Sequence, residues 1–151
     1  MNVVKTFVDT YRPYAEQSEK ETGIPALFSL AQAALESGWG KNVKGNNMFG
    51  IKARPNAMPD DEQLILTTEY NKRKHLWEKI KAWFRKYKTP KESFTDHALF
   101  LLSNPRYKKA LEYKQYPQRF AQEVAEAGYA TDPNYAQKLI TIMKMIKPYF
   151  N

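Results

Sequence analysis

Residues 30–53 read LAQAALESGWGKNVKGNNMFGIKA, and they carry the strongest structural signal in the chain. The first half predicts a helix, because apolar residues recur at helical spacing from Ala26 to Leu35. Pro25 suits the first turn of that helix, and Gly38 suits its end, where left-handed backbone is common. The pattern therefore predicts a mostly buried helix that ends abruptly at a loop rich in glycine and asparagine.

Glu36 falls in the last turn of this helix, which is an unfavourable place for a carboxylate. The partial negative charge at a helix C-terminus and apolar surroundings both raise the pKa of a carboxyl group. A raised pKa suits a general acid that works near neutral pH. The alternative is an ordinary surface residue paired with Lys41 or Lys44, but Trp39, with a glycine on each side, favours an aromatic cleft wall.

Seven segments follow one another in a recognisable order. They are ALESGWGKN (34–42), NNMFGIKA (46–53), TTEY (67–70), FRKY (84–87), SFTDHALFL (93–101), NPRY (104–107) and AGYATDPNYAQKL (127–139). Together they resemble the signature of glycoside hydrolase family 73, the bacterial endo-β-N-acetylglucosaminidases that cut peptidoglycan. The resemblance spans nearly the whole chain. It implies a mainly helical α+β domain of lysozyme-like type, with a small β-hairpin beside the active-site cleft, and no cofactor.

The composition agrees with a folded enzyme domain. The chain has 151 residues, 42% of them hydrophobic and 14% aromatic, so we expect one catalytic domain over residues 1–151 with a sizeable core. It contains no cysteine, which excludes disulfides and thiolate metal sites. No apolar run approaches the roughly 20 residues that span a bilayer, so we expect no membrane insertion.

Periodicity predicts helices with one strand pair. A first helix is expected over 3–20, where Pro13 would kink or split it. Strands are expected over 64–70 and 75–87, although the second also fits a helix and its assignment depends on the resemblance. Trp77 and Trp83 are interpreted as packing residues of this hairpin. Later helices are expected over 92–102, 104–111, 117–128 and 132–145, with Asp132 as N-cap and Pro133 first in the last one.

The resemblance assigns roles to particular residues. Glu36 matches the general acid, and Glu69 in TTEY matches the second carboxylate, whose alternative is an exposed residue at a strand end. Six further residues match substrate contacts: Trp39, Asn47, Phe49, Gly50, Asp96 and Tyr129. Each has a structural alternative: Trp39 as a lid, Phe49 and Tyr129 as core rings, and Asp96 as a polar residue near a helix start.

Glycoside hydrolysis leaves two routes open. In an inverting enzyme Glu69 would stand roughly 6.5–9.5 Å from Glu36, with a water between them. In the substrate-assisted route the acetamido group of N-acetylglucosamine attacks the anomeric carbon, and Glu69 or Asp96 orients that group. A muramidase and a lytic transglycosylase are rival readings, because lysozyme-like folds support all three cleavages. A wall-binding module without turnover is a rival from another class.

Charge and motifs indicate the partners. The net charge of +8 predicts attraction to polyanions, either peptidoglycan with its anionic wall polymers or nucleic acid, and no nucleic-acid motif supports the latter. His75 and His97 lack metal-ligand spacing, so we expect no metal. We expect a monomer that acts on the bacterial cell wall, outside the cell or in the periplasm. Because no signal-peptide pattern is visible, cytoplasmic accumulation before phage-type release and a trimmed sequence are both alternatives.

Overall fold

The computed structural model describes residues 2–150, and it confirms the predicted mainly helical α+β class. The helices are α1 (Val3–Thr22), α2 (Ala26–Ser37), α3 (Pro90–Ser103), α4 (Pro117–Glu126) and α5 (Tyr135–Ile146). The strands are β1 (Glu62–Asn71) and β2 (Leu76–Arg85), and short 3-10 helices lie at Pro59–Asp61, Pro105–Tyr107, Ala110–Tyr113 and Lys147–Tyr149. Within the described residues, no helix is both long and apolar enough to cross a membrane.

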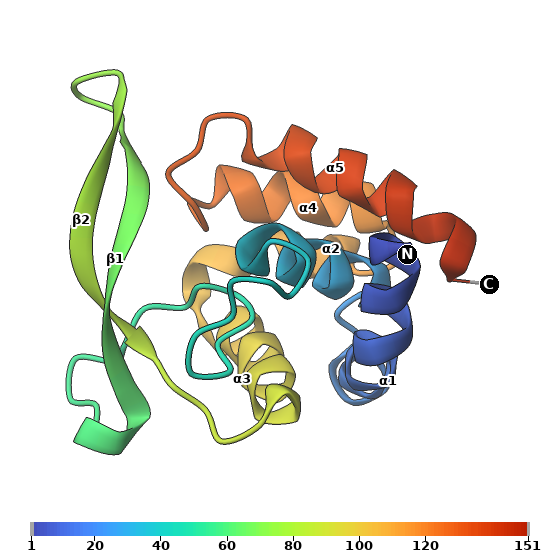
Figure 1. Ribbon diagram of the computed structural model, residues 1–151. Helices are drawn as coiled ribbons and strands as arrows, with labels where there is room; N and C mark the ends of the chain where they lie inside the picture. The colour runs from blue at the N-terminus through green and yellow to red at the C-terminus, as the bar shows by residue number, and fades with distance from the viewer. Residues whose placement is uncertain (1, 151) are drawn as a thin grey trace.

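Helix α2 lies at the centre of the helical body, with the other helices around it (Figure 1). Nine of its twelve residues are buried, which agrees with the apolar pattern that predicts the helix. Gly38 ends it in the left-handed conformation, with φ of 57°, and the backbone amide of Gly38 donates to the Ala34 carbonyl. The predicted end of this helix is therefore confirmed.

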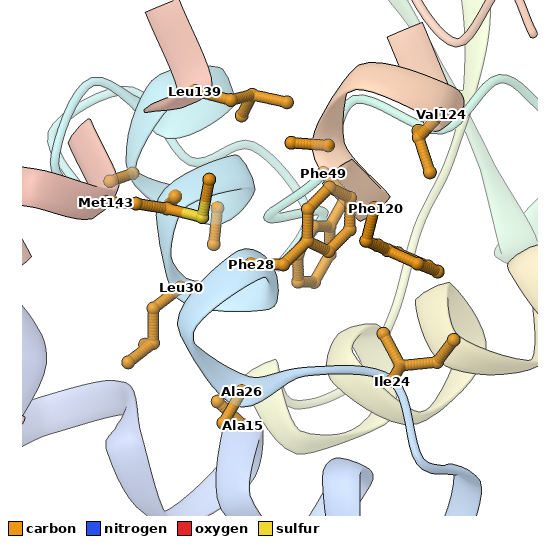
Figure 2. Close-up of a cluster of buried hydrophobic side chains, with 14 of the residues drawn as sticks. Ala15, Ile24, Ala26, Phe28, Leu30, Phe49, Phe120, Val124, Leu139 and Met143 are labelled. Atoms are coloured by element: carbon orange, nitrogen blue, oxygen red, sulfur yellow. The ribbon is translucent and has the colours of Figure 1, made fainter. Parts of the chain in front are cut away.

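Aromatic and aliphatic side chains from several helices interlock around α2 (Figure 2). The rings of Phe28 in α2 and Phe120 in α4 meet edge to face, with centroids 4.7 Å apart. Leu139 and Met143 of α5 cover a neighbouring part of the helix. Each fully buried side chain of this size stabilises the fold by about 1.5–3 kcal/mol. This packing fixes the helix that carries Glu36.

The two strands form an antiparallel hairpin that stands beside the helical body (Figure 1). The turn without glycine, residues 72–75, is closed by His75 in the left-handed conformation, with φ of 55°. The interpretation of Trp77 and Trp83 as packing residues of the hairpin holds in part for Trp77, whose ring meets that of Tyr70 edge to face with centroids 5.3 Å apart. Neither ring is buried, because their exposed fractions are 51% and 52%. Both rings project from a two-stranded ribbon, and such a ribbon has no second layer to cover them.

Three prolines behave differently from the predictions. Helix α1 is not split at Pro13, because this exposed residue leaves the freed Asp9 carbonyl on the outer face of the helix. Pro25 is the N-cap of α2 and not a residue of its first turn. Helix α5 begins at Tyr135 and not at Pro133, since Asp132 Oδ1 accepts from the Asn134 amide and closes a separate turn.

The segment after α3 also differs in type. Residues 104–111 form 3-10 turns where a short helix is predicted, and the Asn104 side chain caps the first of them. A short segment beginning at Asn104-Pro105 has too few residues to propagate α-helical hydrogen bonds.

Candidate active site

A cleft of about 830 Å³ separates the hairpin from the helical body. Glu36 lines it at the C-terminal end of α2, and Glu69 and Trp77 line it from the hairpin. The loop between α4 and α5 supplies Tyr129, Thr131 and Asp132, and the first residue of α5 supplies Tyr135; Asn47 and Gly50 complete this part of the wall. The predicted acid and second carboxylate therefore line the same cleft.

Glu36 is exposed on the cleft surface while protein surrounds it on its other sides. Removal from water raises its pKa from 4.5 to about 7, a hydrogen bond from Tyr135 lowers it, and the negative charge of Asp132 raises it. The Tyr135 hydroxyl donates to Glu36 Oε1 at 2.7 Å. Solvent on the exposed side of the carboxylate opposes the shift, whereas a sugar over it would strengthen the shift by excluding water. Glu36 thus has the acidity that a general acid needs.

Glu69 lies on β1 and is mostly covered, with a side-chain exposure of 22%. Lys52 Nζ lies 3.0 Å from its Oε1 and 3.2 Å from its Oε2. Lys52 comes from the loop that pairs with the base of the hairpin, so the ion pair holds the Glu69 carboxylate in place on the cleft wall. The alternative reading of Glu69, an exposed residue at a strand end, is therefore disfavoured.

The loop before the hairpin is shaped by Asn47, Phe49 and Gly50. The Asn47 side chain accepts from the backbone amides of Phe49 and Ile51 and donates to the carbonyls of Ile51 and Arg85. The buried Phe49 ring stacks on His97 with centroids 3.7 Å apart. Phe49 is therefore a core anchor, and Asn47 holds the loop even where its surface lines the cleft.

Gly50 lies directly against the acid. Its φ is 63°, and a Cβ at this position would stand 2.9 Å from Glu36 Oε2. The positive φ favours glycine here, and a Cβ would displace the Glu36 carboxylate from its position. The backbone therefore approaches Glu36 closely at Gly50, and not at the glycines on either side of Trp39.

Tyr129 lines the cleft with its ring, but its hydroxyl is already engaged. The hydroxyl donates to the Phe49 carbonyl at 2.9 Å, and the ring stacks on Tyr135 with centroids 5.9 Å apart. Burial and the charge of Glu36 raise the pKa of the Tyr129 hydroxyl well above its usual value. Tyr129 thus joins the α4–α5 loop to the Phe49 loop and leaves an aromatic surface for substrate.

Two predicted contacts lie away from the cleft lining. Trp39 packs edge-on against Phe7 of α1, with centroids 5.6 Å apart, so its position favours a packing role over either a sugar contact or a lid. Asp96 accepts from Arg54, Arg85 and Tyr87, and it borders a separate hollow of about 610 Å³. Burial opposes its ionisation, but the hydrogen bonds from Tyr87 and Arg85 prevail and lower its pKa. Asp96 therefore fastens the base of the hairpin to α3.

Three polar residues of the site are not among the predictions: Gln32, Tyr135 and, as a buried partner, His97. Gln32 had a visible signal, because it is the one amide in an apolar helix and lies four residues before Glu36, on the same face. Tyr135 lies in the AGYATDPNYAQKL segment, but no residue pattern distinguishes it from Tyr129. Among residues 2–150, no group of three or more metal-ligating side chains could hold a metal ion.

Known proteins resemble this chain over almost its full length. A family model described as "Mannosyl-glycoprotein endo-beta-N-acetylglucosaminidase" matches residues 12–148. The peptidoglycan hydrolase FlgJ of Pseudomonas aeruginosa is 39% identical over 150 residues, which are 95% of this chain and 37% of that relative. The exo-glucosaminidase LytG of Bacillus subtilis is 34% identical over 93% of this chain and 50% of its own length.

A solved structure gives the same fold. The truncated glycoside hydrolase domain of Salmonella typhimurium FlgJ superposes with a TM-score of 0.73 and 36% identity, covering 96% of this chain and 98% of that one. The predicted lysozyme-like architecture is therefore confirmed. The chain spans 37–47% of the length of the FlgJ proteins of Pseudomonas aeruginosa, Vibrio cholerae and Vibrio parahaemolyticus.

Proposed function

Because this chain belongs to the glucosaminidase family, glycoside hydrolase family 73, we propose that it hydrolyses peptidoglycan with Glu36 as the general acid. The bond is the β-1,4 linkage on the reducing side of N-acetylglucosamine. One observation carries the proposal: Glu36, with a pKa of about 7, lies on a cleft that also presents Glu69 from the hairpin. Two carboxyl groups that flank one bond are the usual requirement of glycoside hydrolysis.

The reaction begins with proton transfer. The Glu36 carboxyl gives its proton to the glycosidic oxygen, the bond from that oxygen to C1 breaks, and positive charge develops at C1. In the inverting route, Glu69 takes a proton from a water as the oxygen of that water bonds to C1. In the substrate-assisted route the acetamido oxygen bonds to C1 as the glycosidic oxygen leaves, and Glu69 stabilises the positive charge of that intermediate. A water that gives a proton to the Glu36 carboxylate then bonds to C1, and the bond between C1 and the acetamido oxygen breaks. NMR of the first product separates the routes, since inversion gives the α-anomer and assistance gives the β-anomer.

The pH dependence follows from the acid. Glu36 donates only while protonated, so we expect kcat/KM to fall as the pH rises above about 7. A flat profile between pH 5 and pH 9 would contradict a general acid with this pKa.

Reducing-end analysis tests the reaction class. Purified peptidoglycan is digested, reduced with borohydride and analysed by mass spectrometry. We expect reduced N-acetylglucosamine ends. Reduced N-acetylmuramic acid ends would indicate a muramidase, anhydro ends a lytic transglycosylase, and no new ends a binding module. The length distribution of the glycan fragments adds the mode of action: early shortening of all chains marks endo cleavage, and release of small products from chain ends marks exo cleavage.

The basic surface supplies the attraction to the wall. The net charge is +8, and Lys72, Arg73 and Lys74 lie together in the exposed hairpin turn. Anionic wall polymers would therefore raise the local concentration of the enzyme at its substrate. Because salt screens such attraction, the rate of hydrolysis of whole cell walls should fall as the ionic strength rises. A rate that is independent of salt would contradict this contribution.

A further inference from the structure

Four side chains lie in a row behind the acid. His97 Nε2 of α3 lies 2.5 Å from Gln32 Oε1 of α2, Gln32 Nε2 lies 3.1 Å from the Tyr135 hydroxyl of α5, and that hydroxyl lies 2.7 Å from Glu36 Oε1. His97 and Gln32 are fully buried, and Tyr135 is 4% exposed. Buried polar groups are generally hydrogen-bonded, with each donor facing an acceptor. The donor and the acceptor of each hydrogen bond in this row of four side chains can therefore be derived.

The position of the hydrogen on the His97 ring decides which group donates in each hydrogen bond of the row. Burial lowers the pKa of His97 to about 3, so the ring is neutral and carries one N–H. Its Nε2 faces an amide oxygen, which only accepts, and its Nδ1 is buried without a partner among the described residues. If Nδ1 carried the hydrogen, a donor would be buried unpaired, and such donors are rarer than unpaired acceptors. The hydrogen is therefore on Nε2.

The remaining hydrogens follow from this one. The Gln32 oxygen is occupied by His97, so its amide hydrogen goes to the Tyr135 oxygen. The single hydrogen of Tyr135 then goes to Glu36 Oε1. Because Oε1 is held as an acceptor, the proton of the neutral acid belongs on Oε2. Gly50 leaves the space for that atom, since a Cβ there would approach Oε2 to 2.9 Å.

We propose that His97 and Gln32 are positioning residues that act through Tyr135 to fix the transferable proton of Glu36 on Oε2, beside Gly50 on the cleft. This inference rests on the proposed role of Glu36 as the acid. The proposal explains why His97 and Gln32 lie within the core. Without these hydrogen bonds, the Glu36 proton would be shared between the two carboxyl oxygens, and only part of the enzyme population would present it toward the substrate.

The other charged groups around the chain are few. Glu36 faces Tyr135 from α5, Asp132 and Tyr129 from the α4–α5 loop, and Glu69 with Lys52 across the cleft. Asp96 is the charged neighbour of His97, and its negative charge opposes the fall of the His97 pKa without reversing it. Removal of the Tyr135 hydrogen bond has a defined sign in this setting: the carboxylate loses a donor, so the pKa of Glu36 rises.

The first test is the tautomer of His97 in the wild-type protein. ¹⁵N NMR of histidine-labelled protein should show the hydrogen on Nε2 and a non-protonated Nδ1 across pH 5 to 8. A hydrogen on Nδ1, or a ring that becomes charged in this range, would overturn the inference. This measurement needs no variant, so it holds even where substitutions in the core impair folding.

The second test compares His97→Phe, Tyr135→Phe and Ser29→Ala. His97→Phe keeps a ring against Phe49 and removes the N–H, while Ser29→Ala removes a buried hydroxyl of α2 that has no partner among the described residues. A proton shared between the two oxygens still lies on Oε2 about half of the time, which costs about twofold in kcat, and the weaker acidity of Glu36 slows the proton transfer further. We therefore expect both Phe variants to lower kcat at least about twofold, with KM within about twofold of wild type. Both should also move the alkaline limb of kcat/KM to higher pH, whereas Ser29→Ala should behave as wild type.

The outcomes separate the two proposals. A wild-type kcat and an unchanged alkaline limb of kcat/KM in His97→Phe would overturn the positioning role of His97 and Gln32. The role of Glu36 as the acid would still stand. Undiminished kcat in Glu36→Gln would instead overturn the proposed function, whatever the tautomer of His97. ¹³C NMR of the labelled Glu36 carboxyl, titrated in each folded variant, gives its pKa independently of turnover.

Discussion

Glu69 and Glu78 are paired directly across the hairpin, yet only Glu69 lines the cleft. Lys52 binds the Glu69 carboxylate, whereas Asn71 and Lys74 bind that of Glu78. The two side chains share a strand pair, a register position and a charge, but face different partners. This gives the second carboxylate of the site an internal control.

Glu69→Gln should therefore lower kcat by about 10²–10⁴-fold, because it removes the carboxylate that accepts a proton or stabilises charge at C1. Glu78→Gln should keep activity near that of the wild type. Steady-state hydrolysis of a soluble glycan fragment measures both. Equal losses in the two variants would mean that the hairpin charge matters only for folding.

Trp77 offers an exposed ring on the cleft, over which Lys138 Nζ lies 5.5 Å from the ring centroid. Aromatic contacts contribute about 0.5–1.5 kcal/mol, so Trp77→Ala should raise KM by about two- to tenfold with little change in kcat. Trp83→Ala is the matched control, since it removes an equally exposed ring of β2 that does not line the cleft. A rise in KM for Trp83→Ala alone would place sugar binding near the base of the hairpin, outside the cleft lining.

The raised pKa of Glu36 has a consequence for stability. Folding disfavours its charged form, so the wild type loses stability as the pH rises from about 4.5 through about 7, while Glu36→Gln does not ionise. The free energy of unfolding, measured with urea, should be similar for the two proteins at pH 4 and higher for Glu36→Gln at pH 8. A difference that is the same at both values would show that the Glu36 pKa is unshifted.

Asp96 should affect stability more than chemistry. Its carboxylate pairs with the mostly covered Arg85, whose guanidinium lies 2.8 Å away. Asp96→Asn leaves that cation without its counter-charge, so we expect a loss of about 1–3 kcal/mol in the free energy of unfolding. Once folded, the variant should keep most of its kcat. A collapse of kcat with unchanged stability would instead restore Asp96 to the substrate site.

The sequence predicted the elements that depend on local pattern. Helix α2 and its glycine end follow from apolar spacing, and Glu36 follows from its place in that helix. The hairpin assignment needed the resemblance, because the composition of residues 75–87 fits a helix as well. The exposure of Trp77 and Trp83 was missed, since periodicity shows which face a residue occupies but not whether another layer covers it.

Site residues could be predicted only where a local sequence motif marks them. Asp96 and Trp39 occupy family positions, but the ion pairs of Asp96 and the contact of Trp39 with Phe7 depend on segments far apart in sequence. The same holds for the hydrogen bonds that link His97 to Glu36 through Gln32 and Tyr135, which join three helices. Pairing across such distances is decided by tertiary packing, which a single sequence does not display.

The most direct measurement of the central claim is hydrolysis of purified peptidoglycan by the wild type, Glu36→Gln and Glu112→Gln in parallel. Glu112 is an exposed carboxylate outside the cleft lining, so it controls for the loss of one negative charge. We predict reduced N-acetylglucosamine ends from the wild type and Glu112→Gln, and none above background from a folded Glu36→Gln. The same ends released at the wild-type rate by Glu36→Gln would contradict the account.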